Sequence, residues 1–132
     1  MASFIEFISF PVIEDHRGNL AFIQNTHLPF EMKRIYYLFD VPSSSFRGGH
    51  SHKEQNKILI ALSGSFDVVL DNGVQRTIVT LNKPNVGLHI KNGIWRELQN
   101  FSSGSVCLVV ASDDFNEDDY IRDYEEFLAS KK

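Results

Sequence analysis

Short apolar runs, separated by turn residues at close and regular spacing, occupy most of this 132-residue chain. The runs are rich in β-branched and aromatic residues, which favour strands, and the segments between them contain Gly, Pro, Asn, Asp or Ser, which favour turns. Many short strands of this kind predict an all-β sandwich or barrel. The runs that we expect to form strands are 4–12, 20–23, 34–39, 57–62, 66–70, 75–81, 86–90, 94–98 and 106–111.

The C-terminal segment alone has a different periodicity. From Asp118 to Ser130 the apolar residues recur at helical spacing, with acidic residues at the start and Lys131 and Lys132 at the end, as the helix dipole favours. We therefore expect one short helix over 118–130. The whole chain, 1–132, is expected to form a single domain, because it is long enough for one hydrophobic core and too short for two.

The charge balance limits the partners that this chain can have. It contains 13 Lys and Arg against 17 Asp and Glu, a formal net charge of -4. Nucleic acid and anionic membranes are therefore poor partners, and an anionic small ligand would need locally placed arginines. The single cysteine, Cys107, lies in an apolar run, which favours a buried, unreactive thiol. With no signal peptide or membrane-spanning stretch apparent, we expect a cytoplasmic protein.

The unusual chemistry is concentrated in the stretch 46–53. On an extended backbone, His50 and His52 point to the same face, because side chains alternate along a strand. Histidine titrates near neutral pH, so a pair of imidazoles in one cavity can take and return protons. Gly48 and Gly49 allow a bend before the pair, and Arg47 adds a permanent cation. A polar sheet face or an adventitious metal site is an equally good interpretation of this spacing alone.

This stretch resembles the first motif of the cupin jelly roll, which has a glycine, His-x-His, an acidic residue and a later glycine. The matching residues are Gly49, His50, His52 and Gly64. Lys57 stands where cupins usually have glutamate, and Arg96 stands where the second half usually has histidine. Two cations beside a metal would repel it, so we expect no metal.

A more specific resemblance covers nearly the whole chain. The sequence is similar to the cupin-type nucleotide-sugar 3,4-ketoisomerases of the WxcM-like family. One departure is Lys57, where these relatives commonly have glutamine. The segments that carry the resemblance are Asp15-x-Arg17-Gly18-Asn19-Leu20, Arg34-Ile35-Tyr36-Tyr37, Arg47-Gly48-x-His50-x-His52-Lys53, Leu62-Ser63-Gly64-Ser65, Ile94-Trp95-Arg96 and the stretch 119–128.

The resemblance implies a cupin jelly roll, a double-sheet β-barrel with a short C-terminal α-helix. It also implies a reaction that needs neither metal nor cofactor, in which dTDP-4-keto-6-deoxy-glucose becomes the 3-keto isomer through an enediol. His50 and His52 would divide proton removal from C3 and delivery to C4, with His50 the expected base and the opposite split still open. Arg47 would favour the enediolate. The product would feed the biosynthesis of dTDP-3-amino-3,6-dideoxy sugars for surface glycans such as lipopolysaccharide.

The remaining substrate contacts are expected from charge and aromatic character. A diphosphate needs cations and a base needs an aromatic face, whereas the Tyr37 phenol can donate to a sugar oxygen. A tryptophan in such a position, as Trp95 is, packs in the core more often than it stacks on a ligand. His89 is expected to face either the cavity or solvent. The substrate-binding candidates are Arg47, Tyr37, Arg17, Arg34, Lys53, Trp95 and Arg96.

Three other functions fit parts of this pattern. A jelly-roll epimerase would invert carbon centres and leave the ketone in place, a metal-dependent cupin such as an oxygenase would need a bound metal, and a sugar-binding cupin would bind without turnover. We also expect a homodimer with exchanged N-terminal strands, because the exposed apolar strand 4–12 invites pairing with a second chain.

Overall fold

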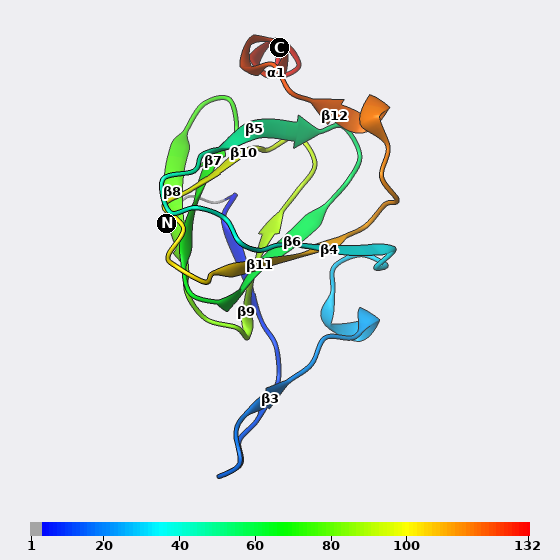
Figure 1. Ribbon diagram of the computed structural model, residues 1–132. Coiled ribbons are helices and arrows are strands. Elements are labelled where there is room, and N and C mark those ends of the chain that lie inside the picture. Colours follow the sequence, from blue (N-terminus) through cyan, green and yellow to red (C-terminus); the bar gives the residue numbers. More distant parts are fainter. Residues whose placement is uncertain (1–3) are drawn as a thin grey trace.

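Two five-stranded antiparallel sheets face each other in the computed structural model, which describes residues 4–132 (Figure 1). In spatial order the first sheet contains β1 (Glu6–Ser9), β9 (Val86–Ile90), β6 (Lys57–Ser63), β11 (Val106–Ala111) and β4 (Arg34–Leu38). The second contains β12 (Tyr120–Ile121), β5 (Arg47–His52), β10 (Trp95–Gln99), β7 (Phe66–Asp71) and β8 (Arg76–Leu81). The prediction of an all-β fold is confirmed.

The main hydrophobic core lies between the two sheets. Alternation along β6 directs Leu59 and Ala61 into it, where they meet side chains such as Val68 and Leu98 from the second sheet. The intervening residues of β6 belong to a second apolar cluster, together with Phe10. Because β6 is buried on both faces, it is apolar along most of its length and offers no signal of which face is inside.

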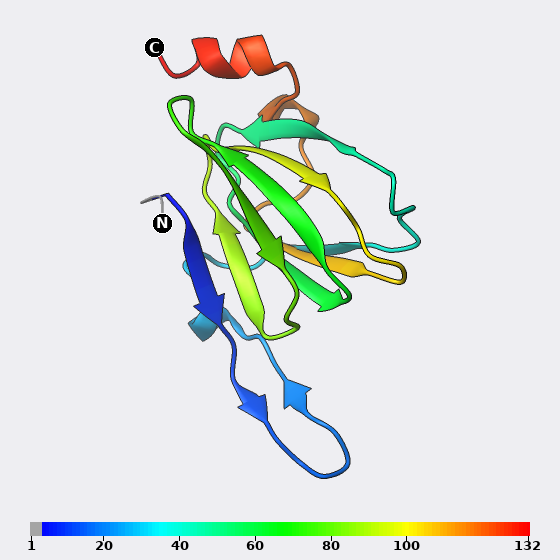
Figure 2. The same cartoon turned by 90° about the vertical axis from the view of Figure 1, so that its left-hand side faces the viewer.

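A two-stranded hairpin projects away from the two sheets (Figure 2). It consists of β2 (Val12–Ile13) and β3 (Leu20–Ala21), and the 3-10 helix η1 (Asn25–His27) follows it. The run 4–12 is therefore not one strand, as predicted, but is interrupted at Pro11, which has no N–H for a sheet hydrogen bond. The first strand, β1, pairs with β9 of the same chain.

The C-terminal helix is much shorter than the predicted 118–130. Residues 117–119 form the 3-10 helix η2 (Glu117–Asp119), β12 follows, and α1 covers only Tyr124–Ala129. Two tertiary interactions override the helical periodicity. The backbone of β12 pairs with the end of β5. The Asp119 carboxylate also accepts hydrogen bonds from backbone N–H groups in the loop after β5. Asp123 caps α1 by accepting a hydrogen bond from the N–H of Glu125.

The strand that carries the two histidines passes very close to the Trp95 ring. A Cβ atom built on Gly49 would lie 2.2 Å from Cζ2 of that indole, which packs against Tyr124 and Phe127 of α1 and cannot easily move. We expect Gly49→Ala to lower the free energy of unfolding by about 1–3 kcal/mol, the usual cost of overpacking. Chemical denaturation would measure it.

Gly48→Ala is the matched control, because a Cβ at Gly48 meets no atom within 4 Å. Equal stability of the two alanine variants would contradict the close packing of Gly49 on Trp95.

Candidate functional site

Two buried imidazoles from one strand lie side by side between the sheets. His50 and His52 are both on β5, and their ring centroids are 5.0 Å apart. The Tyr120 ring lies against both, with its centroid 5.0 Å from that of His50 and 4.3 Å from that of His52. Alternation along a strand therefore places the two rings on one face, as predicted.

His52 is held at both ring nitrogens. Its Nδ1 lies 3.0 Å from Oδ2 of Asp119, and its Nε2 lies 3.3 Å from Nε2 of Gln55. The same carboxylate also accepts hydrogen bonds from the backbone N–H groups of Glu54 and Gln55. The ring of His52 is thus fixed in orientation by contacts within the protein.

His50 is held at one ring nitrogen only. Its Nε2 lies 3.0 Å from Nζ of Lys57, which reaches across from β6 in the opposite sheet. Among residues 4–132, Nδ1 of His50 has no hydrogen-bond partner. His50 is therefore the histidine with a ring nitrogen left for a ligand.

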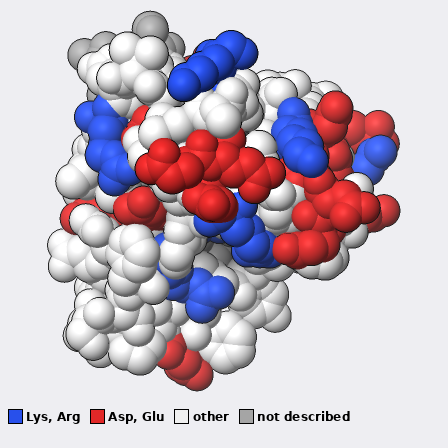
Figure 3. Space-filling model, turned by 90° about the horizontal axis from the view of Figure 1, so that it is seen from above, with Lys and Arg blue, Asp and Glu red and all other residues white. Residues whose placement is uncertain are grey.

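Arginines line the space next to His50. A pocket of about 260 Å³ is bounded by Arg34, Arg47, Arg96 and Arg122, and a neighbouring one of about 370 Å³ shares three of these arginines. The Nε atoms of Arg34 and Arg96 are buried and have no hydrogen-bond partner in the described chain. These donors are available to an anionic ligand. Elsewhere, on the face drawn in Figure 3, acidic and basic side chains lie side by side.

This environment lowers the pKa of each basic group at its centre. Burial, followed by the charge of Arg96, shifts the pKa of His50 far below its usual value. Burial also lowers the pKa of His52 to about 3, although the hydrogen bond to Asp119 opposes the shift. The pKa of Lys57 falls to about 6, mainly through burial and then through Arg96 and Arg34. Near neutral pH both imidazoles are therefore unprotonated and can accept a proton.

Comparison with known proteins agrees with this geometry. The family model described as "FdtA: WxcM-like, C-terminal" matches residues 3–132. The chain belongs to this family. One relative is the TDP-4-oxo-6-deoxy-alpha-D-glucose-3,4-oxoisomerase of Aneurinibacillus thermoaerophilus. It is 44% identical to this chain over 121 residues, which cover 91% of this chain and 87% of the relative. The family assignment made from the sequence is confirmed.

Solved structures of 3,4-ketoisomerases superpose closely on the chain. A mutant of the 3,4-ketoisomerase QdtA from Thermoanaerobacterium thermosaccharolyticum, in complex with TDP-4-keto-6-deoxyglucose, has a TM-score of 0.95 at 38% identity and covers 99% of this chain and 96% of its own. A 3,4-ketoisomerase from Helicobacter canadensis has a TM-score of 0.93 at 44% identity, with 96% of each chain covered. The predicted cupin jelly roll is confirmed.

An epimerase shares the fold of this WxcM-like protein at much lower sequence identity. The rmlC epimerase of Mycobacterium tuberculosis has a TM-score of 0.78 at 14% identity, covering 91% of this chain and 68% of its own. That likeness shows a common jelly roll alone.

Three of the predicted binding residues lie at the histidine pocket of this WxcM-like protein. Arg34, Arg47 and Arg96 line it, and they come from β4, β5 and β10. Arg96 stands directly opposite His50 in the β5–β10 pairing, which explains its effect on that histidine. The structure therefore brings together the histidine pair and three arginines that are far apart in the sequence.

Four other predicted residues lie elsewhere in the chain. Tyr37 is 60% exposed on the outer face of β4, because the inward positions of this strand are those of Arg34 and Tyr36. Trp95 points outward from β10 and packs under α1, where its Nε1 donates to Glu97. The remaining two are exposed in this chain: Lys53 after β5, and Arg17 in the β2–β3 hairpin, paired with Asp15.

The structure also adds residues to the site that were not predicted. Tyr36 replaces Tyr37 as the inward aromatic residue of β4, and Tyr120 and Arg122 arrive with β12 and the segment after it. Asp119 and Gln55 hold His52. The stretch 119–122 was part of the family resemblance, so a signal existed, but helical periodicity concealed its role. His89 lies outside the pocket, bonded to Glu6 and Asn56.

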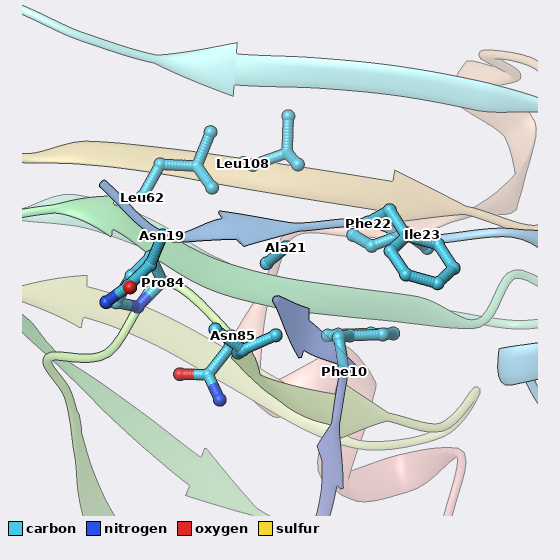
Figure 4. Close-up of a pocket in the computed structure, with 10 residues that line it drawn as sticks. Phe10, Asn19, Ala21, Phe22, Ile23, Leu62, Pro84, Asn85 and Leu108 are labelled. Carbon is cyan, nitrogen blue, oxygen red and sulfur yellow. The ribbon is translucent and has the colours of Figure 1, made fainter. Parts of the chain in front are cut away.

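A larger pocket lies away from the histidines. It has a volume of about 540 Å³ and is lined by residues of the hairpin, including Ala21, and by the outer face of the first sheet, including Leu62 and Leu108 (Figure 4). Its lining is largely apolar and shares no residue with the histidine pocket. It therefore lacks the groups that acid–base chemistry needs.

Residues 4–132 contain neither a cluster of metal ligands nor a membrane-spanning helix. No group of three or more His, Cys, Asp or Glu is arranged to hold a metal ion. In the same part of the chain, no helix is long and apolar enough to span a membrane.

Proposed function

We propose that this protein is a sugar 3,4-ketoisomerase that converts dTDP-4-keto-6-deoxy-glucose to the dTDP-3-keto-6-deoxy-hexose. The observation that carries the proposal is a pair of buried imidazoles in an arginine-lined pocket, in a chain that is 44% identical to a 3,4-oxoisomerase. The jelly-roll epimerase, the weaker alternative, shares only the fold with this chain.

In the proposed reaction, Nδ1 of His50 removes the proton from C3. The electron pair of the C3–H bond forms a C3–C4 double bond, and the π electrons of the C4 carbonyl move to its oxygen. Arg96, which is buried, and Arg47, which lies exposed at the rim of the pocket, stabilise the resulting negative charge. A proton is then returned to C4, and the C3 hydroxyl proton passes to the C4 oxygen, which leaves the ketone at C3. His52 assists delivery through its position beside His50.

The diphosphate of the ligand is proposed to bind at the rim of the same pocket. Arg34 and Arg47 can each present a planar pair of donors to phosphate oxygens, and Arg122 adds positive charge although its Nε and Nη2 donate to Glu117. In the described chain the guanidinium of Arg34 lies over the Tyr36 ring and donates one side-chain hydrogen bond, to the Gln55 oxygen at 3.3 Å, so most of its donors are free. Arg17, Lys53, Tyr37 and Trp95 remain predictions as ligand contacts.

The proposed product suggests the reaction that would follow, an amino transfer to C3. A 3-keto sugar is the substrate that an amino-transfer reaction needs, which leads to a dTDP-3-amino-3,6-dideoxy sugar. We further propose a cytoplasmic enzyme with one domain over 1–132, supported by its buried single thiol and by the family match over residues 3–132.

Product analysis in deuterated water tests the function directly. After incubation with dTDP-4-keto-6-deoxy-glucose, we expect proton NMR to show a ketone at C3 and deuterium at C4, with the rate unchanged by a chelator. A ketone that stays at C4 with inverted neighbours would instead identify an epimerase. Binding without turnover would identify a sugar-binding module, and loss of activity that one divalent ion restores would overturn the metal-free mechanism.

We also propose that the protein is a homodimer built with exchanged N-terminal strands. Its apolar groove of about 540 Å³ is open, and the adjoining hairpin exposes Ile13 and Leu20, which pair across its two strands. An exchange would replace the β1–β9 pairing within one chain by the same pairing between two chains. A second copy of the chain fits both the groove and the exposed hairpin.

Sedimentation at micromolar concentration checks this proposal. We expect a dimer for the natural protein and a monomer for the double variant Ile13→Asp, Leu20→Asp, because two charges would have to be buried at the interface. Val74→Asp is the control, since Val74 is almost fully exposed in the turn after β7. A natural protein that sediments as a monomer would remove the proposal.

A further inference from the structure

A lysine buried without a carboxylate partner is the group of this site that the proposed mechanism does not yet use. Lys57 is 1% exposed, and its Nζ lies 3.0 Å from Nε2 of His50. In the described chain it forms no ion pair with an acidic side chain. An isolated ammonium is costly to bury, so such a site favours the neutral amine, which has a lone pair to offer.

The groups around Lys57 strengthen this preference. From β4 it faces the Tyr36 ring at 5.6 Å, and from β12 the Tyr120 ring at 5.5 Å. Arg96, Arg34 and Arg122 all act against its charge, and Asp119 is the group that acts in its favour. His50 is the neighbour at hydrogen-bond distance. The amine is therefore placed against one ring nitrogen of the proposed base and is surrounded mainly by cations.

We propose that His50 and Lys57 act together as the base of the reaction, with Lys57 as the positioning residue that receives a proton through His50. As the C3 proton arrives at Nδ1, the proton on Nε2 passes to the Lys57 amine, so the imidazole stays neutral and the charge appears on the lysine. Before the return step, the proton on Nδ1 exchanges with solvent. The lysine then gives its proton back to Nε2, and Nδ1 delivers the exchanged proton to C4. The inference rests on the proposed function.

Electrostatics explains why the pair is needed. Burial beside Arg96 makes an imidazolium at His50 very unfavourable, which would leave this histidine alone a weak base. The pKa of Lys57 is lowered only to about 6, so the lysine is the stronger proton acceptor of the two and is still largely unprotonated at pH 7. A general base is most effective when its pKa lies near the working pH.

His52 cannot supply the same function. Both of its ring nitrogens are held within the protein, by Asp119 and by Gln55. Asp119 keeps the proton of His52 on Nδ1, whereas Nε2–H of His50 donates to the neutral Lys57 amine, which leaves Nδ1 of His50 free to accept a proton from the ligand. The two histidines thus share one strand face but differ in which nitrogen is available.

Titration of the free protein tests the pair without any turnover. In protein labelled with carbon-13 at lysine, we expect the Cε signal of Lys57, assigned by its loss in Lys57→Met, to titrate near pH 6, far below the other lysines. The signal is also expected to shift in His50→Asn. A Lys57 that stays charged above pH 9 would overturn the proposal, and this holds whether or not the protein is an isomerase.

The pH dependence of turnover is the second test. We expect kcat/KM of the natural enzyme to rise with pH through about 6, where the lysine loses its proton. Lys57→Met should lower kcat at pH 8 by roughly 10²-fold with little change in KM, because the proton acceptor is lost but the ligand contacts remain. Lys57→Gln, which keeps a hydrogen bond to Nε2, should still lose the rise near pH 6.

Lys83→Met, at an exposed lysine in the turn between β8 and β9, is the control and should keep the natural profile. A rise near pH 6 that persists in both Lys57→Met and Lys57→Gln would overturn the proposal. Absence of turnover in the natural protein would refute the proposed function instead, and the lysine titration would still decide the state of the pair.

Discussion

Replacing His50 with asparagine is expected to lower turnover by about 10²–10⁴-fold, the usual contribution of a general acid–base group. Asparagine keeps the polarity and approximate size of the side chain but cannot take a proton at neutral pH. In the described chain, Nδ1 of His50 is free, whereas both ring nitrogens of His52 are held. His52 therefore cannot replace His50 as the base. The rate of product formation by NMR measures the effect.

The same experiment should include His52→Asn and the double variant. His52→Asn should also lower turnover, because the His52 ring packs 5.0 Å from that of His50 and assists proton delivery from that position. The double variant should be little worse than the poorer single one, since groups that act as a unit are not additive. Circular dichroism and calorimetric binding of the dTDP-sugar are the controls. Near-normal turnover in both single variants, with the fold intact, would contradict the mechanism.

Asp119→Ala is expected to lower the free energy of unfolding by about 3–5 kcal/mol, the range found when one partner of a buried charged contact is removed. The carboxylate accepts hydrogen bonds from the backbone N–H groups of Glu54 and Gln55 at 2.8 and 3.1 Å, and it lies 3.0 Å from Nδ1 of His52. Alanine would leave all three donors without this acceptor. Urea denaturation followed by fluorescence measures the change.

Asp118→Ala provides the comparison, because the neighbouring Asp118 is exposed and its side chain makes none of these contacts. We expect a change in stability within about 0.5 kcal/mol for this variant. If both aspartate variants were equally stable, the buried carboxylate could not be what fastens β12 to β5.

The sequence predicts the fold and the histidine pair well, because both depend on local alternation. Turn residues between short apolar runs mark the strands, and positions 50 and 52 must share a face on any extended backbone. The choice between Tyr36 and Tyr37 is different. β4 exposes Ile35, Tyr37 and Phe39 on its outer face, so both of its faces are apolar and the pattern does not show which one is inside.

The other differences from the sequence-based expectations have a related cause. Trp95 and Arg96 are adjacent, but of the two only Arg96 lines the histidine pocket, because α1 covers the outer face of β10 with its own aromatic residues. Residues 118–123 have helical spacing, but contacts with β5, which is distant in sequence, hold them in a 3-10 turn and a strand. Such long-range pairings leave no mark on local periodicity.

The pairing of β12 with β5 affects the order in which this protein can become functional. The histidine strand ends at residue 52, yet the groups that hold and cover its rings, Asp119 and Tyr120, belong to the end of the chain. During synthesis the two sheets can largely assemble before these residues emerge, but the proton-transfer site cannot. Nascent chains that stop before residue 119 should therefore contain most of the barrel while His52 lacks its carboxylate, so that competence for the reaction comes as a late and separate step of maturation.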